Sequence, residues 1–229
     1  MKQTTWIKTD LPIHYRMHRP TSTPKAIAFF LHGYTDHGAS FFRRLFPNGW
    51  PQELSDVAWI APNGPFPVPV KTPIGWREAY SWYFYDMEAE KMAVPPDTAL
   101  QAIETILDLH FPEGHSLIPK LIVGFSQGGF LAPMLAHRLA HTKELITVGT
   151  GYRPEYYQAL SPLTVTAVHG SVDEVFPSDA AIKAHQSVLK LGHHGQFHVI
   201  ADAGHTATEA MGAIVHQQLA RLIHTGGTP

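Results

Sequence analysis

The sequence predicts an α/β fold in which a mostly parallel central sheet is covered by helices on both faces. Short, continuously apolar runs alternate along the chain with longer segments of helical periodicity. This alternation is typical of βαβ units, which build parallel sheets. The apolar runs contain few polar positions, as expected for strands that are buried on both faces. With 229 residues, 44% of them hydrophobic, the chain can build a sizeable core, and we expect one domain over residues 1–229.

Six strands are expected from the apolar runs. They cover residues 26–31, 57–61, 120–124, 145–149, 164–169 and 196–201. The first run, AIAFFL, is short, apolar and uncharged, which is typical of a strand buried in the middle of a sheet. A weaker alternation over residues 4–19 predicts one or two antiparallel strands at a sheet edge.

Four helices are expected between or after these strands. They cover residues 97–110, 127–140, 178–191 and 206–224. Asp97 follows two prolines and is a suitable N-cap for the first helix. Pro133 falls inside the second helix, where it removes a backbone hydrogen bond. We therefore expect Pro133 to kink that helix or to confine it to a short first turn.

Residues 62–96 form a long connection between a predicted strand and a predicted helix. The segment is rich in proline, and its aromatic residues are Phe66, Trp76, Tyr80, Trp82, Tyr83, Phe84 and Tyr85. Loops of this length in compact domains usually serve a function, and this one should lie over the carboxyl edge of the sheet, where ligands bind. Two interpretations stay open. Either the aromatic residues form a lid or wall, with Trp76 and Trp82 contacting a substrate, or they form a hydrophobic cluster that only anchors the loop.

Composition excludes several classes of function. The chain has no cysteine, which rules out disulfides, thiolate metal sites and a cysteine nucleophile. Its net charge of −2 comes from charges of both signs along the chain, and no basic stripe indicates a nucleic-acid partner. We expect no membrane insertion, since no run of eighteen apolar residues occurs. We expect a cytoplasmic location, since the first ten residues are polar and lack the apolar part of a signal peptide.

A Gly-x-Ser-x-Gly motif, GFSQG, lies between a predicted strand and a predicted helix. This is the context of a nucleophile elbow, a sharp turn that lifts a serine hydroxyl above the sheet. Gly124 and Gly128 flank the serine because a side chain at either position would crowd the turn. The start of the following helix supplies partial positive charge where an oxyanion would form. Ser126 is therefore the candidate nucleophile.

A serine nucleophile needs a histidine base and an acid that orients the base. In sites of this kind the acid and then the histidine follow the serine along the chain. Asp173 lies in the loop after the strand predicted at 164–169, and His205 lies in a Gly-His turn before the last helix. Asp173 and His205 are the candidate acid and base. Glu174 and Asp179 are alternatives for the acid.

Two backbone N–H groups are expected to bind a negatively charged oxygen at this site. One belongs to Gln127, directly after the serine, and the other to Tyr34 in the loop LHGYTDHG that follows the first predicted strand. Gly33 lets this loop approach a substrate closely. His32 is expected to hold the geometry of the loop rather than to act as a base.

Four sequence blocks together resemble the phospholipase/carboxylesterase family of α/β-hydrolases, which includes the acyl-protein thioesterases. The blocks are FFLHGYTDHG, GFSQGG, HGSVDEVFP and AGHTATEA, and YSWYFYD is a weaker match. They occur in the family's order over roughly residues 26–224. The resemblance implies an α/β-hydrolase fold and hydrolysis of carboxylic esters, thioesters or lysophospholipids without a cofactor or metal. It places the catalytic triad at Ser126, Asp173 and His205, and the oxyanion amides at Tyr34 and Gln127.

Two features depart from the family's pattern. Phe176 stands before a proline where the family usually has a small aliphatic residue, and it should contact the substrate and narrow the acyl pocket. Residues 62–96 are longer and more aromatic than the family leads us to expect. Both features make a small or aromatic ester at least as good a candidate substrate as a long-chain lipid.

Other interpretations stay open at this point. A non-catalytic ligand-binding protein on a hydrolase fold usually lacks a triad residue, whereas all three are present here. A peptidase or amidase uses the same triad. A metal enzyme is the weakest alternative, because His137 and His141 have no third ligand near them in the sequence. The expected partner is a small-molecule ester or thioester, and the sequence also leaves a homodimer open.

Overall fold

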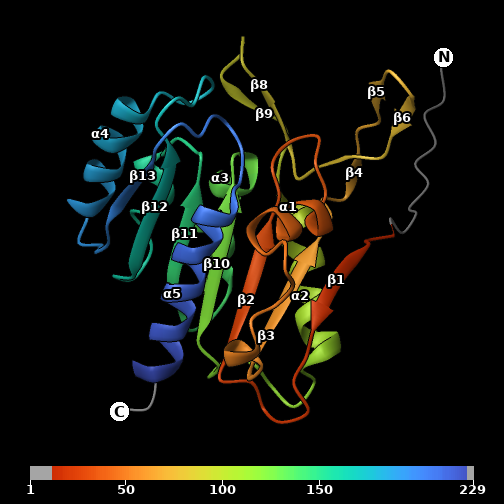
Figure 1. Cartoon of the computed structure of the whole chain (residues 1–229), viewed down its shortest axis with the longest axis vertical. Coiled ribbons are helices and arrows are strands. Elements are labelled where there is room, and N and C mark those ends of the chain that lie inside the picture. The colour runs from red at the N-terminus through yellow and green to blue at the C-terminus, as the bar shows by residue number, and fades with distance from the viewer. Residues whose placement is uncertain (1–11, 226–229) are drawn as a thin grey trace, which may run out of the picture.

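The central feature of the fold is a seven-stranded sheet with helices on both faces (Figure 1). It is seen in a computed structural model that describes residues 12–225. The strand order is β1-β3-β2-β10-β11-β12-β13, and every neighbouring pair is parallel except β1 and β3. The sheet consists of β1 (Tyr15–His18), β2 (Ala26–Leu31), β3 (Val57–Pro62), β10 (Lys120–Phe125), β11 (Thr142–Val148), β12 (Thr164–Gly170) and β13 (Phe197–Ile200). The predicted fold class is confirmed.

The helices pack against the sheet in two layers. They are α1 (Gly38–Leu45), α2 (Asp97–His110), α3 (Gln127–Arg138), α4 (Ser178–Leu189) and α5 (Glu209–Thr225), with short 3₁₀ turns η1 (Gln52–Leu54) and η2 (Pro154–Tyr156). Helices α1 and α5 lie in front of the sheet in Figure 1, and α2 and α3 lie behind it. Successive side chains of β2 point to opposite faces, so Phe29 packs with α2 and α3 while Phe30 packs with α1 and α5.

All six strands predicted for the middle of the sheet are present, with ends that differ by a few residues. The predicted edge strand is β1, which pairs antiparallel with β3. The part of that prediction that covers residues 4–11 lies outside the described residues. The four predicted helices are also present, but Asp97 is the first residue of α2 and Pro96 occupies the N-cap position. Helix α3 continues past Pro133 to Arg138, so this proline does not confine the helix to a first turn.

Helix α1 was not predicted from the sequence. Its N-cap is His37, whose ring Nδ1 accepts a hydrogen bond from the backbone N–H of Ser40 at 3.2 Å. Histidine is not among the usual N-cap residues, so this helix start gave no recognisable signal. The helix buries Phe41, Phe42 and Leu45 against the sheet. Arg43 is exposed, whereas Arg44 is partly buried and pairs with Asp36.

Residues 62–96 form three two-stranded antiparallel sheets above the carboxyl edge of the central sheet, at the top of Figure 1. The pairs are β4 (Phe66–Pro67) with β7 (Tyr80–Ser81), β5 (Val70–Thr72) with β6 (Gly75–Arg77), and β8 (Phe84–Asp86) with β9 (Lys91–Val94). The strands β2, β10, β12 and β13 end at the same edge, so the loops that follow them begin there. The fold therefore gathers the candidate site residues beneath the three small sheets.

His32 holds the loop between β2 and α1. Its fully buried ring accepts a hydrogen bond from the Gly64 N–H at Nε2 (2.9 Å), so Nδ1 carries the proton and donates to the Gly33 carbonyl (2.7 Å). The centroids of the His32 and Trp82 rings lie 4.6 Å apart, and the Trp82 indole N–H donates to the His32 carbonyl at 2.7 Å. Burial lowers the pKa of His32 to about 4, which keeps the ring neutral.

The buried, neutral His32 should make the stability of the protein fall on acidification. Below pH 6.5 the unfolded chain takes up a proton at His32 that the folded chain does not take up until about pH 4. Between these values, stability therefore falls as the pH falls, by about 1.4 kcal/mol per pH unit for one such group. His32→Asn, which cannot be protonated in this range, should have a shallower dependence in urea unfolding between pH 7 and pH 5. Equal slopes for the variant and the wild type would contradict a neutral His32.

Gly212 sets how closely α5 packs on α1. A Cβ atom at this position would lie 1.9 Å from the carbonyl oxygen of Leu45. Alanine is normally more stable than glycine inside a helix by about 1 kcal/mol. We expect the opposite sign here, with Gly212→Ala lowering the free energy of unfolding by about 2 kcal/mol, because overpacking outweighs helix propensity. Urea denaturation measures the change.

The matched control is Ala213→Gly, one residue further along the same helix. Ala213 is exposed, so this variant should lose only about 0.5–1 kcal/mol, the ordinary cost of glycine in a helix. A Gly212→Ala variant at least as stable as the wild type would show that the two helices do not pack as closely as described.

Candidate active site

Ser126 lies in the sharp turn between β10 and α3 and has a strained backbone. Its φ of 50° and ψ of −114° are unusual for a residue other than glycine. Strain of this kind costs about 1–3 kcal/mol and persists only where the surroundings enforce it. Here the Ser126 N–H donates to the Val148 carbonyl (3.0 Å), and the Ser126 carbonyl accepts from the Thr150 hydroxyl (2.9 Å). The end of β11 thus holds the turn in place.

The two glycines of the motif allow α3 to pack close to the sheet. A Cβ at Gly124 would lie 2.3 Å from the Gly128 carbonyl oxygen, and a Cβ at Gly128 would lie 2.2 Å from the Leu31 carbonyl oxygen. These contacts are with backbone atoms, which cannot rotate away. Any larger residue at either position would push the helix, and Ser126 with it, away from the sheet.

The structure brings together the three residues predicted as nucleophile, base and acid. The Ser126 hydroxyl lies 3.0 Å from Nε2 of His205. The Nδ1 atom of His205 lies 2.9 Å from Oδ2 and 3.1 Å from Oδ1 of Asp173. An N–H at Nδ1 donates to the carboxylate, which leaves Nε2 as an acceptor for the serine hydroxyl. The three side chains therefore form one hydrogen-bonded row.

The Asp173 carboxylate is buried and held by backbone amides. Its Oδ1 accepts hydrogen bonds from the N–H groups of Val175 (2.9 Å) and Phe176 (2.8 Å). Burial alone would raise the pKa of Asp173, but the Phe176 amide, His205 and the Val175 amide together hold it below its usual value. The group is therefore ionised at neutral pH. The alternative acids Glu174 and Asp179 are both exposed.

His169 supports this carboxylate and was not singled out from the sequence. Its buried ring donates from Nε2 to the Phe176 carbonyl at 2.6 Å, and the same nitrogen lies 3.4 Å from Oδ2 of Asp173. The contact fixes the turn that carries Asp173. The available signal was a histidine at the end of a strand, four residues before the predicted acid.

The Gln127 side chain links the start of α3 to the segment between β7 and β8. Its amide nitrogen donates to the Tyr83 carbonyl (2.8 Å) and the Ser81 hydroxyl (3.0 Å), and its amide oxygen accepts from the Trp82 N–H (3.1 Å). From the sequence, only the backbone of Gln127 has a predicted role. The side chain in addition fixes the position of the segment that carries Tyr83.

Tyr34 lies in a loop that passes directly beside Ser126. A Cβ on the preceding residue, Gly33, would lie 2.8 Å from the Phe125 ring and 3.4 Å from the Ser126 Cβ. The Tyr34 side chain is half exposed and meets the Phe84 ring edge-on, with centroids 6.5 Å apart. The loop therefore brings both the backbone and the side chain of Tyr34 to the serine.

A cavity of about 470 Å³ opens at Ser126. Its lining is mostly aromatic and consists of Tyr34, Tyr83, Phe84, Tyr85, Met87, Met92, Ser126, Gln127, Phe130, Arg153, Tyr156 and Phe176. The predicted contact residue Phe176 is part of this wall and lies between Phe130 and His205, with ring centroids 5.7 Å from each. The cavity is large enough for a small organic ligand.

The two tryptophans predicted to contact substrate lie away from this cavity. Trp82 is buried against His32, and Trp76 is 71% exposed on β6. The neighbours Tyr83, Phe84 and Tyr85 line the cavity instead. Trp82 thus anchors the segment, whereas the three residues after it line the cavity. Aromatic content alone did not indicate which side chains turn toward the site.

The described residues contain neither a metal-binding cluster nor a membrane-spanning helix. No cluster of three or more histidine, aspartate or glutamate side chains within residues 12–225 is arranged to hold a metal ion. His141 lies beyond the end of α3, and its ring nitrogen Nδ1 lies 2.6 Å from the Leu117 carbonyl. Over the same part of the chain, every helix is too short or too polar to span a bilayer.

Comparisons with known proteins identify the family and relatives of this chain. The family model for phospholipase/carboxylesterase matches residues 14–223. The chain is 24% identical over 199 residues to acyl-protein thioesterase 1 homolog 2 of Dictyostelium discoideum, and the match covers 82% of this chain and 88% of the relative.

Solved structures show the same fold. The crystal structure of esterase PE8 matches with a TM-score of 0.73 and 24% identity, covering 92% of this chain and 99% of the other. The crystal structure of Zea mays acyl-protein thioesterase 2 matches with a TM-score of 0.65 and 19% identity, with the same coverage of 92% and 99%. The family model matches nearly the whole described chain. This protein therefore belongs to the phospholipase/carboxylesterase family, whose members are α/β-hydrolases of esterase and thioesterase type.

Proposed function

We propose that this protein is a serine hydrolase that cleaves carboxylic esters or thioesters through an acyl-enzyme intermediate on Ser126. The observation that carries the proposal is the hydrogen-bonded row of Ser126, His205 and Asp173, with its serine end at an aromatic cavity. Nucleophile, base and orienting acid lie within the reach that this chemistry needs. The family match and the names of its relatives support the same class of reaction.

The reaction begins with attack of the Ser126 oxygen on the substrate carbonyl carbon. His205 takes the hydroxyl proton at Nε2, which faces the serine oxygen at 3.0 Å. Asp173 holds the ring in the required tautomer and stabilises its charged form. His205 then donates the proton to the leaving alcohol or thiol. A water molecule, deprotonated by the same histidine, cleaves the acyl-enzyme and releases the acid.

The oxyanion of each tetrahedral intermediate is assigned to the backbone amides of Tyr34 and Gln127. Gln127 is the first residue of α3, so its N–H has no carbonyl one turn earlier in the helix to bond. The partial positive charge of the helix start adds to this stabilisation. Because Gly33 has no side chain, the Tyr34 loop can lie within contact distance of Ser126. The hydrogen bonds of the His32 ring with Gly33 and Gly64 fix the position of that loop.

The cavity favours small or aromatic acyl groups. Most of the side chains that line its volume of about 470 Å³ are aromatic, and Phe176 occupies the wall beside His205. The β8–β9 hairpin supplies another part of the wall, in agreement with the role proposed for residues 62–96. Thioesters are included among the substrates because the Dictyostelium relative is named a thioesterase. A single domain without a cofactor, a cytoplasmic location and a homodimer stay predictions.

Loss of the Ser126 hydroxyl should abolish turnover. For Ser126→Ala we expect kcat with 4-nitrophenyl butyrate to fall by at least about 1,000-fold, because the variant lacks the nucleophile. Circular dichroism should be unchanged, since the strained backbone at this position does not depend on the hydroxyl. The control is Ser187→Ala, at an exposed position on α4, which should retain full activity. Turnover by Ser126→Ala at the wild-type rate would disprove the assignment.

Shortening Phe176 should shift the preference for acyl chain length. Phe176→Ala removes a ring from the cavity wall but keeps the backbone N–H that holds Asp173. We expect kcat/KM for 4-nitrophenyl octanoate to rise relative to that for the butyrate by about ten-fold, the effect of making room for apolar groups of this size. Trp76→Ala, on the exposed hairpin, should leave the ratio unchanged. An unchanged ratio in Phe176→Ala would place the acyl chain elsewhere.

A further inference from the structure

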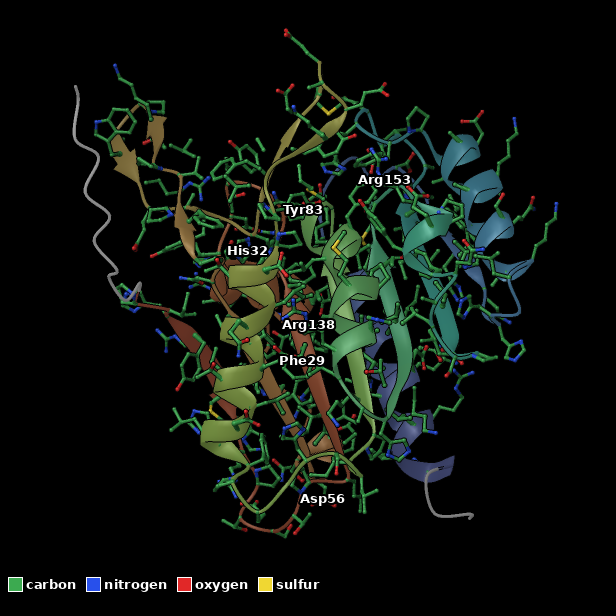
Figure 2. All side chains as sticks on the ribbon, turned by 180° about the vertical axis from the view of Figure 1, so that it is seen from behind. Phe29, His32, Asp56, Tyr83, Arg138 and Arg153 are labelled. Atoms are coloured by element: carbon green, nitrogen blue, oxygen red, sulfur yellow. The ribbon has the colours of Figure 1, made fainter. Side chains whose placement is uncertain are left out.

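Arg153 is the only side chain with a formal charge at neutral pH among the described residues that line the cavity. It lies in the loop between β11 and η2, and Figure 2 shows it and Tyr83 at the same end of the molecule. The rest of the lining consists of aromatic and methionine side chains, Ser126 and Gln127. The Arg153 side chain is 42% exposed, so it keeps part of its hydration while it contributes to the wall.

Contacts with Tyr85 hold the Arg153 side chain at the wall. One guanidinium nitrogen donates to the Tyr85 hydroxyl oxygen at 2.9 Å, and the guanidinium carbon lies 5.0 Å from the centroid of the Tyr85 ring. Tyr85 belongs to β8, so the contact joins the β8–β9 hairpin to the loop after β11. A guanidinium carries five N–H donors, and this hydrogen bond uses one of them. Arg153 therefore keeps donors for a ligand.

The nearby carboxylate does not neutralise Arg153. Glu155 approaches the other terminal nitrogen at 3.6 Å, and the two side chains are 42% and 57% exposed. Exposed ion pairs contribute only about 0–1 kcal/mol, and this one is longer than a hydrogen bond. Glu155 also lies outside the cavity lining, whereas Arg153 is part of it. The positive charge is thus available on the cavity side.

Four tyrosines line the cavity, and three of them lie close enough to Arg153 to interact with it. These three are Tyr83, Tyr85 and Tyr156. Burial raises the pKa of Tyr83 and of Tyr156, so both keep their protons at neutral pH. The Tyr85 oxygen accepts from Arg153, which leaves its own O–H free to donate to another acceptor. A guanidinium with protonated phenols near it is a suitable environment for a negatively charged acceptor.

We propose that Arg153, with the hydroxyls of Tyr83, Tyr85 and Tyr156, forms a subsite for a carboxylate on the substrate. This inference rests on the proposed function and specifies its substrate class as esters or thioesters whose cavity-bound part combines an apolar or aromatic body with a carboxylate. The body packs against the aromatic wall, the carboxylate binds Arg153, and the ester carbonyl lies at Ser126. A carboxylate suits a single guanidinium, since both groups are planar and can form two parallel hydrogen bonds. A phosphate dianion would leave one negative charge uncompensated here.

Binding of a matched acid and amide tests the subsite without any chemical step. Isothermal titration calorimetry compares 4-phenylbutyrate with its uncharged analogue 4-phenylbutyramide on the wild-type protein. We expect the acid to bind at least ten-fold more tightly. In Arg153→Gln this preference should fall to less than two-fold. In Arg138→Gln, whose arginine pairs with Asp97 and Glu104 away from the cavity, it should be unchanged.

The wild-type comparison makes the proposal falsifiable even if Arg153→Gln does not fold. Equal affinity of the wild type for the acid and the amide overturns the subsite. A preference that persists in a folded Arg153→Gln variant overturns the role of Arg153. Loss of the preference in the control Arg138→Gln would assign it to the overall charge of the protein and would also overturn the proposal.

A kinetic comparison separates this inference from the proposed function. Wild-type protein is assayed with 4-nitrophenyl hydrogen adipate and with its uncharged carbamoyl analogue. The subsite predicts that the ratio of their kcat/KM values favours the acid and falls at least ten-fold in Arg153→Gln. If neither ester is cleaved although the acid binds selectively in calorimetry, the proposed function fails and the subsite stands. If both are cleaved equally and no selective binding occurs, the subsite fails and the proposed function stands.

Discussion

The conformation of Ser126 is the constraint on which the rest of the site depends. A residue other than glycine has a positive φ at this turn because α3 packs directly on the backbone of β2 and β10. This packing requires glycine at positions 124 and 128, since a Cβ at either would lie within 2.3 Å of a carbonyl oxygen. The strain costs about 1–3 kcal/mol, which the sheet and helix packing offsets. As a result, the serine hydroxyl projects toward the loops after β12 and β13, which carry Asp173 and His205.

The surroundings of Ser126 are arranged before any substrate binds. Backbone amides and His205 hold the buried Asp173 in its charged form, and His169 fixes the turn from which it projects. On the other side, the Gln127 side chain ties the segment after β7 to the start of α3. Groups positioned in this way need little reorganisation during a reaction, which is the main source of catalytic power in sites that stabilise developing charge.

The sequence predicted the features that depend on local patterns. Apolar runs located the strands, and the glycine-flanked serine between a strand and a helix located the turn. The order of acid and histidine then indicated the residues that the fold brings to Ser126. Features that depend on side-chain direction could not be predicted. Trp82 and Tyr83 are neighbours and both are buried, but of the two Tyr83 alone also lines the cavity. Arg153 gave no signal, because its significance depends on contacts with Tyr85, 68 residues away. Helix α1 was missed because its N-cap is a histidine.

The central claim is that Ser126 is the reactive nucleophile of this protein. The most direct measurement is mass spectrometry of the intact protein after treatment with a fluorophosphonate, followed by peptide mapping of the adduct. We expect one phosphonyl group per chain, located on Ser126, because among residues 12–225 this is the only serine whose hydroxyl is hydrogen-bonded to a histidine and which lines the cavity. No adduct, or an adduct on another residue while Ser126 stays unmodified, would contradict it.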